Sequence, residues 1–441
     1  MKNGKRKALL GVLIIVGLVL CIGLFMKNKT NTLNTTSINK ESTSKELDEN
    51  LIGAYIQNGD DYTPTSDIPT SGYEFNAEKS YCKIGDVVQE DMTLSYDMDT
   101  QTLTVSPIAK EGTKCYLYFD EHKIPAGETI LAHYQTVLTR TSFSSTVTNT
   151  TTGTIYKSAN ESQYDDFGEV YYFAGNPTDN WFQFGTNSSG QPLYWRIIRI
   201  NGDGSVRLIY NGTSTNQTGN STMINTRRAF NSSYNNNMYV GYMYQSGQPH
   251  GLTRNSSIKT TLDSWYLSNL ADEAEYLDGN AGFCGDRTPY SGSGTGTNNT
   301  NYGAYNRLYT NKAPTFKCTD KDNDLYTTPG SSEGNGALKV TPSDNDSTPT
   351  PIGLITADEV AFAGGVSGSN NTSYYLYSNA YYWTMSPCWY NNAAYVFYVS
   401  SSGSLRNDWV TFTTGVRPVI NLKSAIAITG SGTTSDPFKI Q

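Results

Sequence analysis

Residues 381–422 read YYWTMSPCWYNNAAYVFYVSSSGSLRNDWVTFTTGVRPVINL and contain three of the six tryptophans of the chain. Within residues 394–400 both sets of alternating positions are largely apolar, a pattern typical of a strand that is covered on both faces. Ser401, Ser402 and Gly403 follow as a short turn, because glycine accepts the positive φ that such turns need. The segment therefore predicts strands joined by tight turns, and it ends in a β-branched run over residues 416–422.

The composition indicates a large protein with a weakly charged surface. Its 441 residues leave room for two to three domains. Only 16% of the residues are charged, whereas tyrosine alone occurs 33 times, so we expect a surface made polar by hydroxyl and amide groups. The net charge of −8, with no basic stripe along the chain, argues against a nucleic-acid partner.

The N-terminus has the pattern of a membrane anchor. Residues 1–7 form a basic flank, and residues 8–26 form an uncharged apolar run. A helix of that length spans roughly 28 Å, close to the thickness of a bilayer core. The flank predicts a cytoplasmic N-terminus and an uncleaved signal anchor in the plasma membrane, with the bulk of the chain extracellular. A cleaved signal peptide is the alternative.

Three segments follow the anchor. Residues 27–50 contain almost nothing to bury and predict a disordered, solvated stalk. Residues 51–120 alternate short strand candidates with Gly, Pro, Asp and Asn, which predicts a small β-sandwich-like spacer module. Residues 121–153 combine a short helix at residues 127–138 with a Ser/Thr-rich stretch, and we interpret them as a linker.

The six cysteines bear on metal binding and on location. No CxxC pair occurs, which argues against zinc and thioredoxin-like sites, and we expect no metal and no cofactor. An extracellular address permits disulfides, and we predict the local pairs Cys82–Cys115 and Cys284–Cys318. Cys21 would then lie in the membrane, and Cys388 would be free or buried. The alternative is that all the cysteines are reduced core thiols.

A large C-terminal domain is predicted over residues 154–424, with an edge hairpin at residues 425–441. Its clearest signal is a hairpin in which residues 194–200 and 205–210 flank an Asn-Gly-Asp-Gly turn. This hairpin carries three arginines, Arg196, Arg199 and Arg207. They could bind an acidic ligand, but we expect them to lie on the strand surface and face water.

The best helix of this domain is predicted at residues 256–276, with Ser256 as its N-cap and Trp265 on its apolar side. The composition of residues 288–350 predicts a loop-rich insertion.

Five blocks of this domain, in this order, resemble a bacterial family of unknown function found in surface proteins of Firmicutes. The blocks are YWRII at residues 194–198, SIKTTLDSWYLSNL at 257–270, IGLITADE at 352–359, YWTMSP at 382–387 and GVRP at 415–418. The family is similar by pattern to C-type-lectin-like and formylglycine-generating-enzyme-like folds. The resemblance covers about residues 154–424 and implies an α+β, β-rich, C-type-lectin-like domain. It implies no activity.

The resemblance also has departures. Thr384 and Met385 stand where the family has Leu-Arg, so no role of that arginine carries over. The Glu-Pro-Asn and Gln-Pro-Asp tripeptides with which true C-type lectins bind calcium and sugar are absent. The oxidase relatives need two cysteines close together, and only Cys388 lies in the corresponding region.

These features favour a membrane-anchored, surface-exposed binding or adhesion protein for an extracellular protein or glycan. Loops rich in Tyr, Asn, Ser and Trp give recognition area at low entropy cost. The expected ligand-binding residues flank the strand at residues 394–400: Trp389, Tyr390, Asn391, Asn392, Asn407, Asp408 and Trp409. A structural cell-envelope or pilus-like component is the alternative, followed by an oxidase of the formylglycine-generating type. No His–carboxylate–nucleophile arrangement is visible, so we expect no catalytic residues.

Overall fold

The structure is a computed structural model that describes residues 52–69, 72–98, 100–107, 109–122, 124–328 and 350–441, together with the backbone of two short strands at residues 36–37 and 338–339. The chain divides into two compact units, Met1–Lys123 and Ile124–Gln441. The predicted basic flank, signal anchor and stalk, residues 1–50, lie outside the described residues except for Thr36–Ser37. No helix within the described ranges is long and apolar enough to cross a membrane.

The first unit contains two β-sheets with a shared core. The larger sheet has, in spatial order, β3 (Asp61–Thr65), β2 (Ile52–Asn58), β8 (Thr113–Glu121), β4 (Tyr73–Ile84) and β5 (Val87–Val88). The smaller sheet has β1 (Thr36–Ser37), β7 (Thr102–Ser106) and β6 (Thr93–Asp97). Every second residue of β8 is buried, as expected of a strand with one face on a core. There Leu117 and Phe119 pack with Leu94 and Leu103 of the smaller sheet.

Both predicted disulfides are present. Cys82 and Cys115 face each other on β4 and β8, with Cα atoms 4.0 Å apart. In the second unit Cys284 and Cys318 are bonded, with a Cα separation of 5.5 Å. The predicted pairing is therefore confirmed, and two disulfides fit an extracellular protein.

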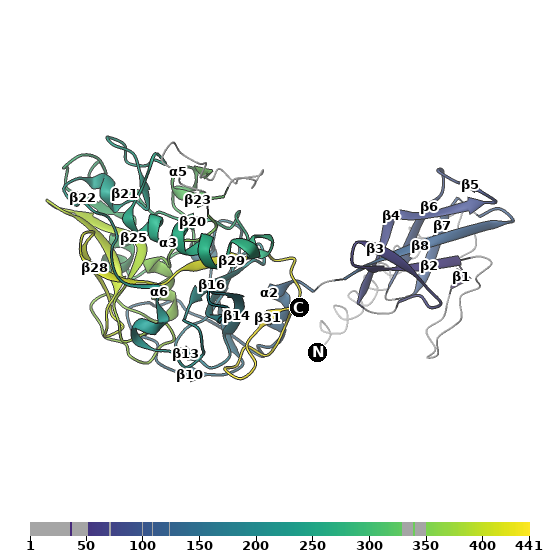
Figure 1. Ribbon diagram of the computed structural model, residues 1–441, viewed down its shortest axis with the longest axis horizontal. Coiled ribbons are helices and arrows are strands. Elements are labelled where there is room, and N and C mark those ends of the chain that lie inside the picture. Colours follow the sequence, from purple (N-terminus) through teal and green to yellow (C-terminus); the bar gives the residue numbers. More distant parts are fainter. Residues whose placement is uncertain are drawn as a thin grey trace, which may run out of the picture. The chain divides into compact units, whose positions relative to one another are not determined.

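The second unit is built on two large sheets (Figure 1). The first has β29 (Val419–Leu422), β16 (Val206–Tyr210), β15 (Pro192–Ile200), β12 (Tyr171–Tyr172), β11 (Thr154–Lys157) and β9 (Thr136–Thr139), with β14 (Trp181–Thr186) also paired to β15. The second has β17 (Asn225–Ala229), β28 (Thr413–Val416), β25 (Tyr382–Tyr390), β22 (Thr300–Tyr302) and β21 (Pro289–Ser291), and β26 (Ala394–Val399) joins β25 to β27 (Leu405–Trp409). The described residues thus form a β-rich α+β structure.

Small sheets and short helices complete this unit. The small sheets pair β10 (Thr150–Thr151) with β13 (Asn176–Pro177), β18 (Met243–Tyr244) with β19 (Arg254–Asn255), β20 (Phe283–Cys284) with β23 (Leu325–Thr327) and β24 (Leu338–Lys339), and β30 (Ile428–Thr429) with β31 (Lys439–Ile440). The α-helices are α2 (Ala126–Ala132), α3 (Ser257–Asn269), α4 (Gly303–Tyr305), α5 (Lys321–Asp324) and α6 (Ala357–Ala363). A π-helix, η5 (Asn306–Asn311), and the 3-10 turns η1 (Glu161–Gln163), η2 (Gly219–Thr222), η3 (Asn237–Val240) and η4 (Ala271–Tyr276) join them.

The long predicted helix is present but shorter. Its α-helical part, α3, ends at Asn269 and continues as η4. The Ser256 hydroxyl accepts a hydrogen bond from the Lys259 N–H at 3.2 Å, so the predicted N-cap is confirmed. Trp265 packs against the core, with ring contacts to Trp195 and Tyr210.

The linker predicted at residues 121–153 is wrong, since most of it belongs to the second unit. Ala126 and Ile130 of α2 are buried in the main core, and β9 extends the first large sheet by parallel pairing with β11. The helix predicted at residues 127–138 therefore stops at Ala132, because the β-branched residues after it enter the sheet.

The predicted loop-rich insertion at residues 288–350 is also partly wrong. Strands β21 and β22 belong to the second large sheet, and Tyr302 and Leu308 are buried in the main core. Residues 329–349, apart from β24, lie outside the described ranges. At the C-terminus β30 and β31 form the predicted hairpin, and Phe438 between them is buried.

The arginines predicted to face water are buried: Arg196, Arg199 and Arg207. Glu359 of α6 reaches two of them, with its Oε1 atom 2.6 Å from the Arg207 Nε and 3.3 Å from the Arg199 Nε. α6 starts with a capping box between Thr356 and Glu359, which places this carboxylate beside the hairpin. For Arg199 and Arg207 the prediction failed because a carboxylate distant in sequence covers them. Arg196 is instead covered by neutral acceptors, the Asn180 side chain and the Pro177 carbonyl.

Candidate functional site

The strands β25, β26 and β27 carry most of the predicted ligand-binding residues. Trp389 of β25 lies opposite Tyr395 of β26, and Tyr395 in turn lies opposite Trp409 of β27. Directly opposite residues of antiparallel strands project from the same face of the sheet. The β25–β26 connection contains Asn392 with a φ of 56°, a left-handed conformation that asparagine tolerates better than most residues. The three strands thus bring the rings of Trp389, Tyr395 and Trp409 onto one face of the sheet.

Five rings form a continuous surface, here called the aromatic face: Tyr234, Trp409, Tyr395, Trp389 and Tyr305. Successive ring centroids lie 5.4, 6.2, 5.2 and 5.4 Å apart in that order. The first pair is stacked with an interplanar angle of 22°, whereas the second meets edge to face at 85°. The indole N–H of Trp409 also donates a hydrogen bond to the Tyr395 hydroxyl. Such ring pairs contribute about 0.5–1.5 kcal/mol each beyond their buried area.

One end of the aromatic face is open to solvent. Tyr234 and Trp409 remain 41% and 44% exposed, whereas Trp389, Tyr395 and Tyr305 are half-buried beneath or beside them. The N–H of Ala394 donates to the carbonyl of Tyr234 at 2.8 Å, which ties the Tyr234 loop to β26. The result is a stacked pair of exposed rings on a rigid support. It can pack against the apolar face of a sugar or against a peptide side chain.

Amide side chains lie next to these rings. Asn391 and Asn392 are exposed at the β25–β26 turn, where their amides can donate and accept hydrogen bonds. Asn407 projects from the same face as Tyr395 and Trp409, but its amide donates to the Tyr309 hydroxyl at 2.7 Å. We therefore assign Asn407 to the support of the aromatic face and the turn asparagines to its rim.

Two of the predicted site residues do not join the aromatic face. Tyr390 is buried and contributes to the main core. Asp408 lies between Asn407 and Trp409 on β27, so its side chain projects from the opposite face of the sheet. Burial raises the pKa of the Asp408 carboxyl, and its carboxylate accepts a hydrogen bond from the Trp409 N–H at 2.7 Å. Strand alternation is the physical reason that neighbours in sequence are separated here.

Three residues of the aromatic face were not among the predicted site residues: Tyr234, Tyr305 and Tyr395. Strand alternation was a usable signal for Tyr395, which is two residues from Phe397 on the same side of a predicted strand. Tyr234 lies in an Asn/Ser-rich loop and Tyr305 lies in the predicted insertion. Neither residue has a local pattern that could have placed it beside Trp389 or Trp409.

Cys388 lies on β25 next to Trp389, but its thiol is fully buried and forms no disulfide. Burial raises the pKa of this thiol well above its ordinary value. The thiolate is the nucleophilic form of cysteine, so at neutral pH Cys388 is held in the unreactive state. Cys388 packs in the main core of the second unit.

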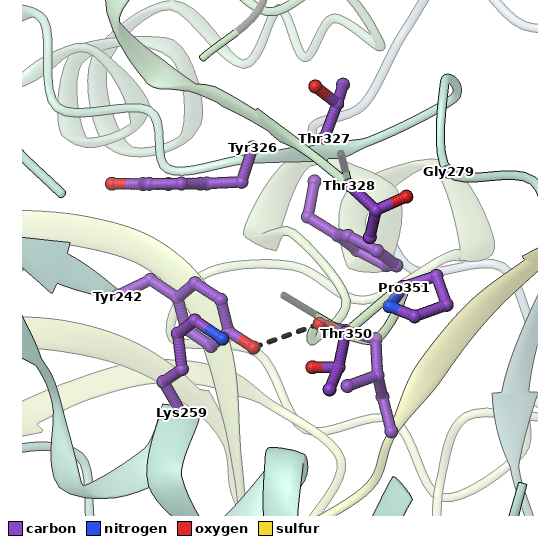
Figure 2. A pocket seen from close by; sticks show the side chains of 10 residues that line it. Tyr242, Lys259, Gly279, Tyr326, Thr327, Thr328, Thr350 and Pro351 are labelled. Atoms are coloured by element: carbon purple, nitrogen blue, oxygen red, sulfur yellow. Dashed lines mark hydrogen bonds between the residues drawn. The ribbon is translucent and has the colours of Figure 1, made fainter. Parts of the chain in front are cut away.

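Lys259 is a buried amine in the second unit. Its ammonium lies 2.8 Å from both carboxylate oxygens of Asp263, and burial lowers its pKa. Figure 2 shows Lys259 beside Tyr242, whose hydroxyl donates to the Ile352 carbonyl at 2.9 Å. The cavity between them measures about 10 Å³, which is close to the space one water needs.

Within the ranges that the structure describes, no three His, Cys, Asp or Glu side chains come close enough to hold a metal ion. No protein-family model, curated protein or solved structure matches the chain. The exposed aromatic face therefore remains the strongest candidate functional site in the second unit.

Proposed function

We propose that the chain is a surface-exposed binding or adhesion protein, anchored in the plasma membrane through residues 8–26, and that its second unit is a C-type-lectin-like recognition domain. The observation that supports this function best is the stacked pair of Tyr234 and Trp409, which is exposed, rigidly supported and flanked by asparagines. Aromatic and amide side chains are the residues that paratopes use to bind protein and glycan partners.

The proposed family fold draws on the five sequence blocks, which occupy structurally decisive positions. Thr356 and Glu359 of the IGLITADE block form the capping box of α6. Trp383 of the YWTMSP block is fully buried, and its indole N–H donates to the Arg228 carbonyl at 2.8 Å. Arg417 of the GVRP block is fully buried as well. Blocks with such roles would be shared by relatives with the same fold and different ligands.

The ligand class can be tested on a glycan and extracellular-protein array probed with the full-length chain. The decisive variant carries Tyr234→Ala and Trp409→Ala, and Tyr381→Ala is the matched control. Tyr381 is 43% exposed but contacts Tyr398 and Phe412, and Tyr398 projects from the opposite face of β26 to Tyr395. We expect the double variant to lose at least about tenfold in affinity, and Tyr381→Ala to bind normally.

Two outcomes would contradict the proposal. Binding that survives the double variant, with circular dichroism unchanged, would show that the aromatic face is not the site. Absence of any binding, together with self-assembly of the chain in sedimentation experiments, would favour the alternative of a structural cell-envelope component.

A further inference from the structure

A polar cleft of about 290 Å³ lies in the second unit and shares no residue with the aromatic face. Its walls come from the β14–β15 pair, from the loop after β16 and from the segment before β25. The lining combines one arginine, four aromatic residues and neutral polar residues, among them Arg196, Trp181, Tyr377, Asn211, Asn216 and Ser373. The volume approaches the lower end of the range for small-molecule sites, which suits a ligand of one or two rings.

The most informative group in this cleft is the guanidinium of Arg196. The residue is only 6% exposed. Its Nε donates to the Asn180 side-chain oxygen at 2.6 Å and its Nη2 to the Pro177 carbonyl at 2.7 Å. No described residue accepts a hydrogen bond from its Nη1. The Trp181 and Tyr375 rings lie 4.2 and 5.3 Å from the guanidinium carbon, so the group is held in one orientation with a donor to spare.

The charge of Arg196 also lacks a partner. Among the described residues no carboxylate lies within 4.0 Å of it. The carboxylate of Asp179 interacts electrostatically with Arg196 but forms no ion pair with it. This carboxylate accepts a hydrogen bond from the Gly153 N–H. Burial lowers the pKa of Arg196 to about 9, which leaves it a cation at neutral pH. Buried charges in proteins are normally paired, because an unpaired one costs several kcal/mol.

A second buried arginine near the cleft, Arg417, also has no acidic partner among the described residues. Arg417 donates to the Tyr210 and Leu376 carbonyls at 3.0 and 3.1 Å, and to the side-chain oxygen of Asn211 at 2.8 Å. All three acceptors are neutral, and Asn211 lines the cleft. Some other buried arginines of this unit do have an acidic partner, as Arg207 has Glu359. Arg196 and Arg417 thus place two guanidinium groups behind this cleft that have no ion-pair partner among the described residues.

The neutral polar residues that line the cleft favour one class of anion over others. No aspartate or glutamate lines the cleft, and its mouth carries exposed hydroxyl and amide side chains, among them Thr372, Ser373 and Asn216. Neutral donors and acceptors of this kind match the hydroxyl groups of a sugar ring. A bare inorganic anion would leave these exposed groups to water and gain no contact from them.

We propose that this cleft binds an acidic monosaccharide unit, with the sugar carboxylate on the Arg196 guanidinium and the ring hydroxyls on the neutral side chains of the mouth. A carboxylate accepts hydrogen bonds from a guanidinium with good geometry and balances its charge. The site is independent of the aromatic face, so the chain would have two separate recognition sites.

The test is isothermal titration of the full-length chain under non-reducing conditions, in a detergent without a sugar headgroup. The probes are D-galacturonic acid and N-acetylneuraminic acid, with D-galactose as the neutral counterpart and inorganic phosphate as the plain anion. We expect at least one acidic sugar to bind at least about tenfold more tightly than galactose and phosphate. Equal binding of acidic and neutral sugar, tighter binding of phosphate, or no binding of any probe would overturn the proposal.

Variants of the exposed Thr372 test whether the acidic sugar binds in this cleft, and they leave the buried Arg196 unchanged. Thr372→Glu places a carboxylate at the exposed mouth, and we expect it to weaken acidic-sugar binding about tenfold by like-charge repulsion. Thr372→Gln, which matches glutamate in size but is neutral, should weaken binding clearly less than Thr372→Glu does. Equal effects of the two variants would refute the site. Trp409→Ala should not alter acidic-sugar affinity, so failure of the aromatic face and failure of the cleft remain distinguishable.

Discussion

Changing Glu359 to glutamine tests whether buried charge balance stabilises the second unit. The Glu359 Oε1 atom lies 2.6 Å from the Arg207 Nε and 3.3 Å from the Arg199 Nε, and all three side chains are buried. Glutamine is nearly isosteric and can still accept the Thr356 N–H that Glu359 accepts in the capping box. The change therefore removes chiefly the charge. Removing one partner of a buried ion pair costs about 3–5 kcal/mol. We expect the lower end, because the Asp165 carboxylate remains 3.9 Å from the Arg199 Nη1.

The matched control is Glu169→Gln. Glu169 also forms an ion pair, with Lys157 at 3.2 Å, but the two side chains are 34% and 39% exposed. Solvent screens such pairs, and we expect a loss below about 1 kcal/mol. Urea denaturation followed by tryptophan fluorescence isolates the second unit, because all six tryptophans lie after residue 123. Equal losses for the two variants would refute the reasoning, and so would a Glu359→Gln protein as stable as the wild type.

Three further predictions concern single residues or pairs. Because burial raises the pKa of its thiol, Cys388 should resist iodoacetamide at pH 8 in the folded protein and react after denaturation, as measured by mass spectrometry. Trp383→Ala removes a fully buried ring and should cost about 3–5 kcal/mol, whereas Trp409→Ala, at a partly exposed position, should cost clearly less in the same urea titration. Replacing Cys82 and Cys115 by alanine opens a 33-residue loop. We expect the free energy of unfolding of the first unit to fall by about 3–4 kcal/mol, as measured by the circular dichroism of its tyrosines during denaturation.

Local patterns in the sequence predicted the elements that depend on local physics. Residues 194–210 form the expected hairpin as β15 and β16 because the Asn-Gly-Asp-Gly turn allows it. Ser256 caps α3 because its hydroxyl can reach the N–H three residues on. The strand at residues 394–400 is covered on both faces, as its two apolar sets indicate. The hairpin pairs residues at most 15 positions apart, as Trp195 with Tyr210, and the helix cap spans three residues.

Contacts between distant segments were beyond such patterns. The aromatic face joins Tyr234 from a loop, Tyr305 from α4 and Trp409 from β27, and no periodicity links them. Arg207 was expected in water because its buried partner Glu359 lies about 150 residues further on in the sequence. The linker prediction failed in the same way, since β9 becomes ordered only by pairing with β11. A side chain's environment in a sheet protein is fixed by which strands are neighbours.

The two proposed sites differ in charge, and they should therefore differ in how strongly salt weakens ligand binding. Aromatic stacking at Tyr234 and Trp409 depends on apolar contact and hydrogen bonds from neutral amides, which salt screens little. Binding at Arg196 depends on an ionic contact, which weakens as ionic strength rises. Raising salt from about 0.05 to about 0.5 M should therefore lower acidic-sugar affinity and leave binding at the aromatic face nearly unchanged. If both affinities fell in parallel, the two ligands would share an electrostatic site, and the assignment of separate chemistries to the aromatic face and the cleft would be wrong.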